Sequence, residues 1–225
     1  MELVVHDTPE ETSRAVADRI AELAAKADDR FTLGLTGGTT PIPAYRILSG
    51  MDLDWEKIDL WITDERWVPP YDERCNGRMA AEVLAGPVGT WLYRPPWAED
   101  MEPDEAAAQY DATVRNLLEG SRPDVIHLGV GEDGHTASLF PNTTALEEWN
   151  RYIVANWVPA QSEFRITATF PLIWSAEVVL VQAHGESKAA AVRDSFAGLT
   201  PAGRLGRGEA RVEWHVDRAA ASLLS

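Results

Sequence analysis

The sequence predicts an α/β protein, a single domain over residues 1–225 with a mostly parallel sheet and helices on both of its faces. Two observations predict this class. Short apolar runs of strand length, such as residues 125–130, alternate with longer amphipathic segments, such as residues 103–119. Several apolar runs end in loops rich in glycine, acids or hydroxyls, at the strand ends where parallel sheets place their ligand crevices. With 225 residues, the chain is long enough for one such domain.

Composition and charge restrict the partners that we expect. The formal net charge of −16 repels polyanions, so nucleic acid and anionic membranes are not expected partners. No apolar run reaches the ~18 residues of a membrane span, and the N-terminus MELVVHDTPEE has acids where a signal peptide needs bases. We therefore expect a cytoplasmic protein, either a monomer or a weak homo-oligomer. The single Cys75 excludes an intramolecular disulfide and a cysteine-based metal cluster.

The N-terminal part is predicted to fold as strand, helix, strand and helix. Residues 3–7 form the first apolar run, and the TPEE sequence at 8–11 has the pattern of a capping box with proline at the first helical position. The helix that follows extends to about residue 27. A strand at 31–36 then leads directly into the turn GGTTP at 37–41 and a second helix.

The GGTTP turn has the composition of an anion site. Its backbone N–H groups and the positive end of the following helix converge on one point. The turn lacks both the Gly-Lys-Ser/Thr ending of a Walker loop and the spacing of a dinucleotide fingerprint. The same residues could also form a plain strand-to-helix turn with a threonine cap.

A third strand is predicted at residues 58–63, and its carboxyl end carries the charged sequence DERWVP at 64–69. Such a charged triplet can equally begin an ordinary salt-bridged loop. Asn76 is expected to cap a helix that ends near residue 84. The neighbouring Cys75 is expected to be small and buried, although its loop position also allows a reactive thiol.

The segment VIHLGVGEDGHTASLFP, at 125–141, follows an extended stretch at 91–97 and a covering helix at 103–119. Its apolar first part is predicted to be a buried parallel strand. Glycines then let the backbone turn where a side chain would clash, and the loop carries Glu132, Asp133 and His135. A plain connection with a solvated acid and histidine would show the same local pattern.

The last part of the chain is predicted to alternate short elements. Lys188, one of only three lysines, follows a strand in the sequence HGESK and precedes a helix of alanines. Either it binds an anion at this junction or it is an ordinary solvated lysine. The expected elements are a short helix at 143–149, strands at 151–158, around 164–167 and at 178–183, a short helix from 171, and a final strand and helix at 213–217 and 218–224.

Five motifs, in order, carry a resemblance to a known family. GVGEDGHTASLFP resembles, nearly letter for letter, the signature of the 6-phosphogluconolactonases in the glucosamine-6-phosphate isomerase/6-phosphogluconolactonase superfamily. LTGGTTP, DERWVP, RIT and the GxxK pattern ending at Lys188 are similar to its other motifs. The chain departs from the family in having Cys75-Asn76 for Ser-Asn, Thr36 and Thr39 for serines in LTGGTTP, and no proline-serine turn at 200–208. The resemblance implies a Rossmann-like fold and hydrolysis of 6-phospho-D-glucono-1,5-lactone to 6-phosphogluconate, the second step of the oxidative pentose phosphate pathway.

The resemblance and the chemistry of lactone opening together suggest residue roles. Attacking water needs a base that titrates near neutrality and the departing ring oxygen needs a proton, and His135 can serve both steps. Asp133 would orient the imidazole or hold a substrate hydroxyl. Asp64 and Arg66 would line the sugar site, with Arg66 polarising the carbonyl or the developing oxyanion. The phosphate is expected to bind Gly37, Gly38, Thr39, Thr40, Arg165 and Lys188.

Two other functions remain open at this point. The deaminase branch of the superfamily shares the phosphate loop and the Asp-Gly-His core, but it carries a carboxylate in the segment after the histidine, where this chain has TASLFP at 136–141. A non-catalytic sugar-phosphate sensor would carry a DNA-binding extension that this sequence lacks. Neither a G-x-S-x-G motif nor metal-ligand spacing occurs, so we expect direct attack by water without a metal or cofactor.

Overall fold

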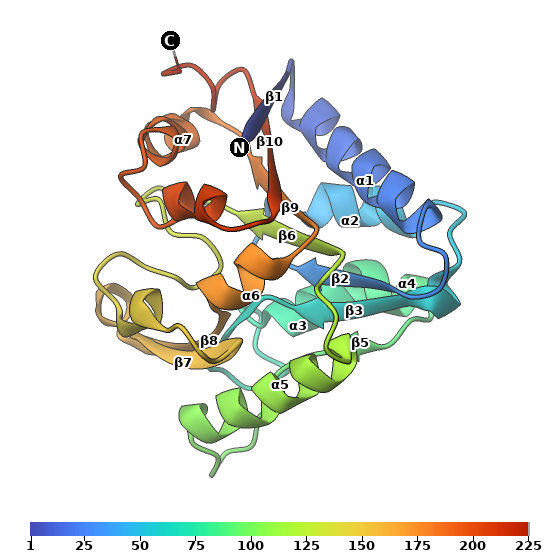
Figure 1. Cartoon of the computed structure of the whole chain (residues 1–225), viewed down its shortest axis with the longest axis vertical. Helices are drawn as coiled ribbons and strands as arrows, with labels where there is room; N and C mark the ends of the chain where they lie inside the picture. Colours follow the sequence, from blue (N-terminus) through green and yellow to red (C-terminus); the bar gives the residue numbers. More distant parts are fainter. Residues whose placement is uncertain (225) are drawn as a thin grey trace.

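The computed structural model describes residues 1–224, which form a seven-stranded parallel sheet and a separate sheet of three antiparallel strands (Figure 1). Every strand pair in the large sheet is parallel. The predicted α/β class with a mostly parallel sheet is therefore confirmed. The strand order is β1 (Glu2–His6), β10 (Arg211–Asp217), β9 (Val178–Ala183), β6 (Val125–Gly129), β2 (Phe31–Leu35), β3 (Ile58–Ile62) and β5 (Leu92–Tyr93).

Helices cover both faces of the large sheet, because its central strands are apolar on both sides (Figure 1). In β6, Ile126 and Leu128 belong to one core cluster and Val125 belongs to the other. The first cluster includes side chains of α5 (Pro103–Leu118), α6 (Phe170–Ser175) and α7 (Ala189–Phe196). The second includes α1 (Pro9–Ala25) and α2 (Ile42–Ser49), and the short helices α3 (Asn76–Ala80) and α4 (Gly86–Val88) lie before β5.

The first helix begins as the TPEE sequence predicts, with one difference. The Thr8 hydroxyl accepts a hydrogen bond from the Glu11 backbone N–H at 3.1 Å, so Thr8 is the N-cap. The Glu11 carboxylate, however, accepts from the Asp7 N–H at 3.0 Å rather than from the cap residue itself. The helix start is thus correct, and the return contact of the capping box falls one residue earlier.

The small antiparallel sheet was not expected from the sequence. It consists of β4 (Asp64–Arg66), β8 (Glu163–Ala168) and β7 (Ile153–Val158). β4 begins two residues after β3 ends, and the Ala168 N–H bonds the Thr63 carbonyl at 2.7 Å between them. The small sheet therefore continues directly from the carboxyl edge of the large one.

Two local expectations were wrong. Cys75, and not Asn76, occupies the N-cap of α3, where its sulfur accepts from the Arg78 N–H at 3.3 Å. Residues 218–224 form turns instead of a helix, because the buried Asp217 carboxylate accepts N–H groups of both Gly185 and Ala220 and holds the chain there. Within the expected 91–97 stretch, only Leu92–Tyr93 joins the sheet. Among residues 1–224, no helix is both long and apolar enough to cross a membrane.

Candidate active site

One pocket of about 280 Å³ lies where β2, β3, β6 and β9 reach the same edge of the large sheet. It combines residues from five separate sequence motifs. Four of the motifs follow strands of the parallel sheet, as expected for its carboxyl edge, and the fifth contributes Arg165 from β8 (Glu163–Ala168) of the small sheet. Asp133 does not line it. The other predicted site residues all do: Gly37, Gly38, Thr39, Thr40, Asp64, Arg66, His135, Arg165 and Lys188.

The GGTTP turn is fixed from both sides. Gly38 has φ +87°, a left-handed conformation that favours glycine. Gly37 lies so close to the Asn76 amide that a Cβ on it would come within 1.9 Å of Asn76 Oδ1. The hydroxyl of buried Tyr45 contacts the Thr36 N–H at 3.0 Å and the Thr36 carbonyl at 3.2 Å, which fixes the strand end that leads into the turn.

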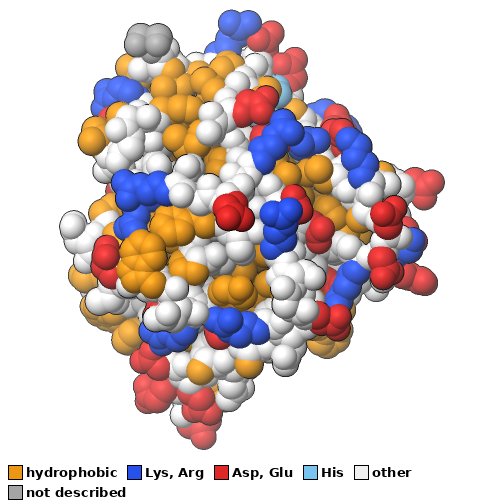
Figure 2. Space-filling view, viewed as in Figure 1, with side chains coloured by type: hydrophobic (Ala, Val, Ile, Leu, Met, Phe, Trp, Pro, Cys, Tyr) orange, Lys and Arg blue, Asp and Glu red, His pale blue; other side chains and the backbone are white. Residues whose placement is uncertain are grey.

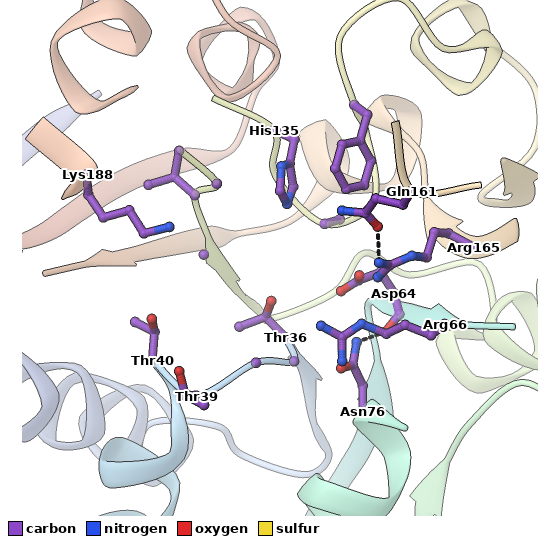
Figure 3. A pocket seen from close by; sticks show the side chains of 17 residues that line it. Thr36, Thr39, Thr40, Asp64, Arg66, Asn76, His135, Gln161, Arg165 and Lys188 are labelled. Atoms are coloured by element: carbon purple, nitrogen blue, oxygen red, sulfur yellow. Dashed lines mark hydrogen bonds between the residues drawn. The ribbon is translucent and has the colours of Figure 1, made fainter. Parts of the chain in front are cut away.

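Lys188 lies beside this turn. It ends a 3-10 turn, Glu186–Lys188, that follows Gly185 with φ +90°. Figure 3 shows its ammonium extending to the end of the pocket where Thr39 and Thr40 lie. Within residues 1–224 no carboxylate forms an ion pair with the Lys188 ammonium, which leaves this charge available to an anion.

His135 is held at an edge and at a face of its ring. Its Nδ1 lies 2.5 Å from Asp133 Oδ1, and its backbone N–H donates to the same oxygen at 3.1 Å. Burial opposes ionisation of Asp133, but these hydrogen bonds outweigh it and lower the pKa of the carboxyl below its ordinary value. Phe140 stacks on the imidazole. Nε2 is therefore the ring nitrogen left to act in the pocket, toward which the ring points in Figure 3.

Asp64 and Arg66 project from β4 on the same face as Arg165 of β8, because Arg66 is directly opposite Arg165 in the antiparallel ladder. Arg165 is largely buried and contacts Gln161 and, at 2.6 Å, Glu163. Burial, followed by the nearby positive charge of Arg66, lowers the pKa of the Arg165 guanidinium from its ordinary value.

The pocket has two cationic ends. Figure 3 shows Lys188 with Thr39 and Thr40 at one end, and Arg66, Arg165 and Asp64 at the other, with His135 between them in this view. The predicted phosphate set thus divides between the two ends. The assignment of Arg165 to the phosphate remains a prediction.

A family profile described as glucosamine-6-phosphate isomerases/6-phosphogluconolactonase matches residues 7–214, almost the whole chain. The chain belongs to this family.

Two relatives in the family are similar to this chain over most of their length. The chain is 34% identical to a 6-phosphogluconolactonase of Nostoc sp. over 216 residues, which cover 91% of this chain and 89% of the relative. It is 35% identical to a 6-phosphogluconolactonase of Rhizobium meliloti over 192 residues, 82% of each chain.

Solved structures of a 6-phosphogluconolactonase and of a glucosamine-6-phosphate deaminase both have this fold. The 6-phosphogluconolactonase of Trypanosoma brucei has a TM-score of 0.87 at 26% identity, covering 100% of this chain and 98% of its own. A monomeric glucosamine-6-phosphate deaminase also has a TM-score of 0.87, at 24% identity, covering 99% of this chain and 100% of its own. The fold therefore does not distinguish the two activities.

Sequence reasoning missed several pocket residues of this family member. Asn76 was expected only as a cap, yet it lines the pocket and donates through Nδ2 to the Asp64 carbonyl at 2.7 Å. Gln161 reaches the pocket from the connection between β7 and β8, and no sequence motif there indicated a site residue. Phe140 lies within the signature segment, and its aromatic character was the available signal.

Glu65, between two predicted site residues, supports the site from behind. Its buried carboxylate accepts backbone N–H groups of Arg66 at 2.8 Å and of Asn76 and Gly77 at 2.7 Å. It therefore connects β4 to the start of α3. Burial, together with this neighbouring carboxylate, raises the pKa of the Cys75 thiol to about 11, so Cys75 is a buried thiol rather than a reactive thiolate at neutral pH.

The 200–208 segment, which departs from the family pattern, lies behind the His135 loop. The Ala202 N–H bonds the Gly134 carbonyl at 3.0 Å, and a Cβ on Gly134 would come within 2.4 Å of Thr200. Gly134 also has φ +78°. The segment supports the loop and contributes no residue to the pocket lining described above.

Proposed function

We propose that this protein hydrolyses 6-phospho-D-glucono-1,5-lactone to 6-phosphogluconate, the second step of the oxidative pentose phosphate pathway. The observation that carries the proposal is the imidazole of His135, which points into the same pocket as the GGTTP turn and Lys188. The named relatives act as 6-phosphogluconolactonases. The proposal covers one domain over the whole chain, acting in the cytoplasm as a monomer or weak homo-oligomer.

In the proposed reaction, His135 Nε2 takes a proton from water as the water oxygen attacks the lactone carbonyl carbon. Asp133 on Nδ1 stabilises the imidazolium that forms. Arg66 stabilises the negative charge on the carbonyl oxygen. The bond between the carbonyl carbon and the ring oxygen then breaks, and the imidazolium returns its proton to the ring oxygen, which becomes a hydroxyl.

The phosphate is proposed to bind at the Lys188 end, to the amides of Gly37, Gly38 and Thr39 and the Thr40 hydroxyl. Figure 2 shows acidic side chains gathered at the lower tip and right edge of this face, with basic ones interspersed. An anionic substrate therefore needs cations concentrated in the pocket, and Lys188, Arg66 and Arg165 supply them.

The deaminase reaction fits the pocket less well. Moving a proton between adjacent carbons of an open-chain sugar needs a dedicated carboxylate base and a histidine poised by a second acid. Phe140, an apolar ring, stacks on the histidine in the segment where the deaminase branch has its carboxylate. Asp64 and Asp133 remain the carboxylates near His135.

The test compares both reactions in one preparation. We expect rapid hydrolysis of freshly generated lactone, followed through formation of 6-phosphogluconate and corrected for spontaneous opening, and no ammonia from glucosamine 6-phosphate. Ammonia release faster than lactone hydrolysis would assign the protein to the deaminases. Binding of 6-phosphogluconate without either reaction would make it a sensor.

A further inference from the structure

The side chain of Ser138 lies outside the pocket and contacts the pocket lining through the Asp64 carboxylate. Ser138 is fully buried and its hydroxyl donates to Asp64 Oδ2 at 2.7 Å. Asp64 lines the pocket and Ser138 does not. The second carboxylate oxygen, Asp64 Oδ1, has one long contact of 3.5 Å with the Thr63 hydroxyl.

Both longer strands of the small sheet fix the position of Ser138. Its N–H donates to the Thr167 hydroxyl of β8 at 3.0 Å, and its carbonyl accepts from the Asn156 side chain of β7 at 2.9 Å. It belongs to a tight turn in which the Leu139 N–H bonds the Thr136 carbonyl at 2.9 Å.

The backbone of this turn is strained at Ala137, the residue before Ser138. Ala137 has φ +46°, in the left-handed region that residues other than glycine rarely adopt. The strained residue lies between His135 and Ser138, and Ala137 itself lines the pocket. The same short segment therefore delivers the imidazole into the pocket and the hydroxyl to Asp64.

We propose that Ser138 is a positioning residue that holds the Asp64 carboxylate in one rotamer, with Oδ1 turned to a hydroxyl of the substrate sugar. A hydroxyl that donates to one carboxylate oxygen fixes the orientation of the carboxylate. Ser138 thereby couples the His135 loop to β4 through one hydrogen bond. This inference rests on the proposed function, in which Asp64 lines the sugar site.

The experiment is a double-mutant cycle with Ser138→Ala, Asp64→Asn and the combination. The matched control is Ser175→Ala, because Ser175 is partly buried and donates a 2.8 Å hydrogen bond to the Leu172 carbonyl of α6, away from the pocket. For each variant, kcat, KM, thermal midpoint and affinity for 6-phosphogluconate are measured.

We expect Ser138→Ala to lower kcat/KM about tenfold and Ser175→Ala to leave it unchanged. In the Asp64→Asn background, Ser138→Ala should have little further effect, because the carboxylate that Ser138 positions is already gone. Ser138→Thr, which retains the hydroxyl, should recover most of the activity.

Two results would overturn the proposal. One is a kcat/KM of Ser138→Ala equal to that of Ser175→Ala. The other is the same fold loss in the Asp64→Asn background as in wild type, which would show that Ser138 acts independently of Asp64. A wild-type protein without lactonase activity would instead contradict the proposed function. The double-mutant cycle, measured as affinity for 6-phosphogluconate, would then still decide whether Ser138 acts through Asp64, because the two substitutions should again be non-additive. If Ser138→Ala does not fold, the activities of Ser138→Thr and Asp64→Asn are compared instead. An activity of Ser138→Thr as low as that of Asp64→Asn rejects the proposal.

Discussion

The Phe140 ring stacks on the His135 imidazole, with ring centroids 3.9 Å apart and ring planes 25° apart. Asp133 holds the Nδ1 edge of the same imidazole. The ring is therefore oriented on two sides before any substrate arrives. This arrangement supports a single histidine acting first as base and then as acid.

Replacing His135 with alanine is expected to lower kcat at least ~100-fold, the usual scale for losing a general acid–base group. Affinity for 6-phosphogluconate should change little, since the phosphate binds elsewhere in the pocket. Steady-state hydrolysis and calorimetric binding measure the two effects. A folded variant with near-normal hydrolysis would remove His135 from the mechanism.

Gly131→Ala is expected to lower kcat at least about tenfold, because near-attack geometry tolerates little displacement. A Cβ at this position would lie 2.1 Å from His135 Nδ1 and 2.8 Å from Asp133 Oδ1, so the imidazole must move. Gly50→Ala is the matched control, since its nearest atom would be a carbonyl oxygen at 3.6 Å. Equal rates for the two variants would show that the observed imidazole position is not required.

Lys188→Ala is expected to weaken substrate binding by ~1.5–3 kcal/mol, the range for hydrogen bonds to charged groups, with a smaller change in kcat. The loss should appear with the phosphorylated lactone and not with unphosphorylated gluconolactone. Lys57→Ala, at a half-exposed lysine outside the pocket, controls for the loss of a charge.

Arg165→Ala tests the other cationic end with the same two lactones. As a phosphate ligand, Arg165 should reproduce the Lys188 pattern. An equal loss on both lactones would place it with Arg66 at the sugar end instead, as its position in the β4–β8 ladder suggests.

Acid is expected to destabilise the fold through His127. Burial, followed by the charge of His215, lowers the pKa of His127 to about 3. The unfolded chain takes up this proton below its ordinary pKa of about 6.5 and the folded chain does not, so stability falls as the pH drops from 6.5 toward 3. Between pH 6.5 and 5.0 the loss should be about 1.6 kcal/mol, because the slope rises from half of 1.36 kcal/mol per pH unit at pH 6.5 toward the full value. Urea unfolding of wild type and His127→Gln checks this, and identical pH slopes would exclude His127 as the cause.

Much of the site could be predicted from the sequence because its residues follow strands of one parallel sheet. Chain order then places Thr40, Asp64, His135 and Lys188 at one edge without knowledge of side-chain contacts. The relation of Arg66 to Arg165 could not be predicted, because β4 has three residues and its partner lies a hundred residues later. The pairing of β4 with β8 depends on tertiary structure and leaves no local pattern in the sequence.

The other misses have similar physical causes. Asn76 has a good capping side chain, but the chain uses it to bond the Asp64 carbonyl, and the Cys75 sulfur takes the cap. Residues 218–224 have helical composition, but a segment this short does not form a helix without packing support, and Asp217 stabilises a turn instead.

The pairing of β1 with β10 has a consequence for how the chain reaches this fold. The last strand pairs with the whole length of the first, from Glu213 opposite Glu2 to Asp217 opposite His6. During synthesis, β1 leaves the ribosome long before its only partner in the described sheet exists. Its backbone N–H and C=O groups must stay solvated until the final strand closes the sheet, a contact of high sequence separation that slows folding. Variants that weaken this edge should therefore show their effect in refolding yield before they show it in turnover.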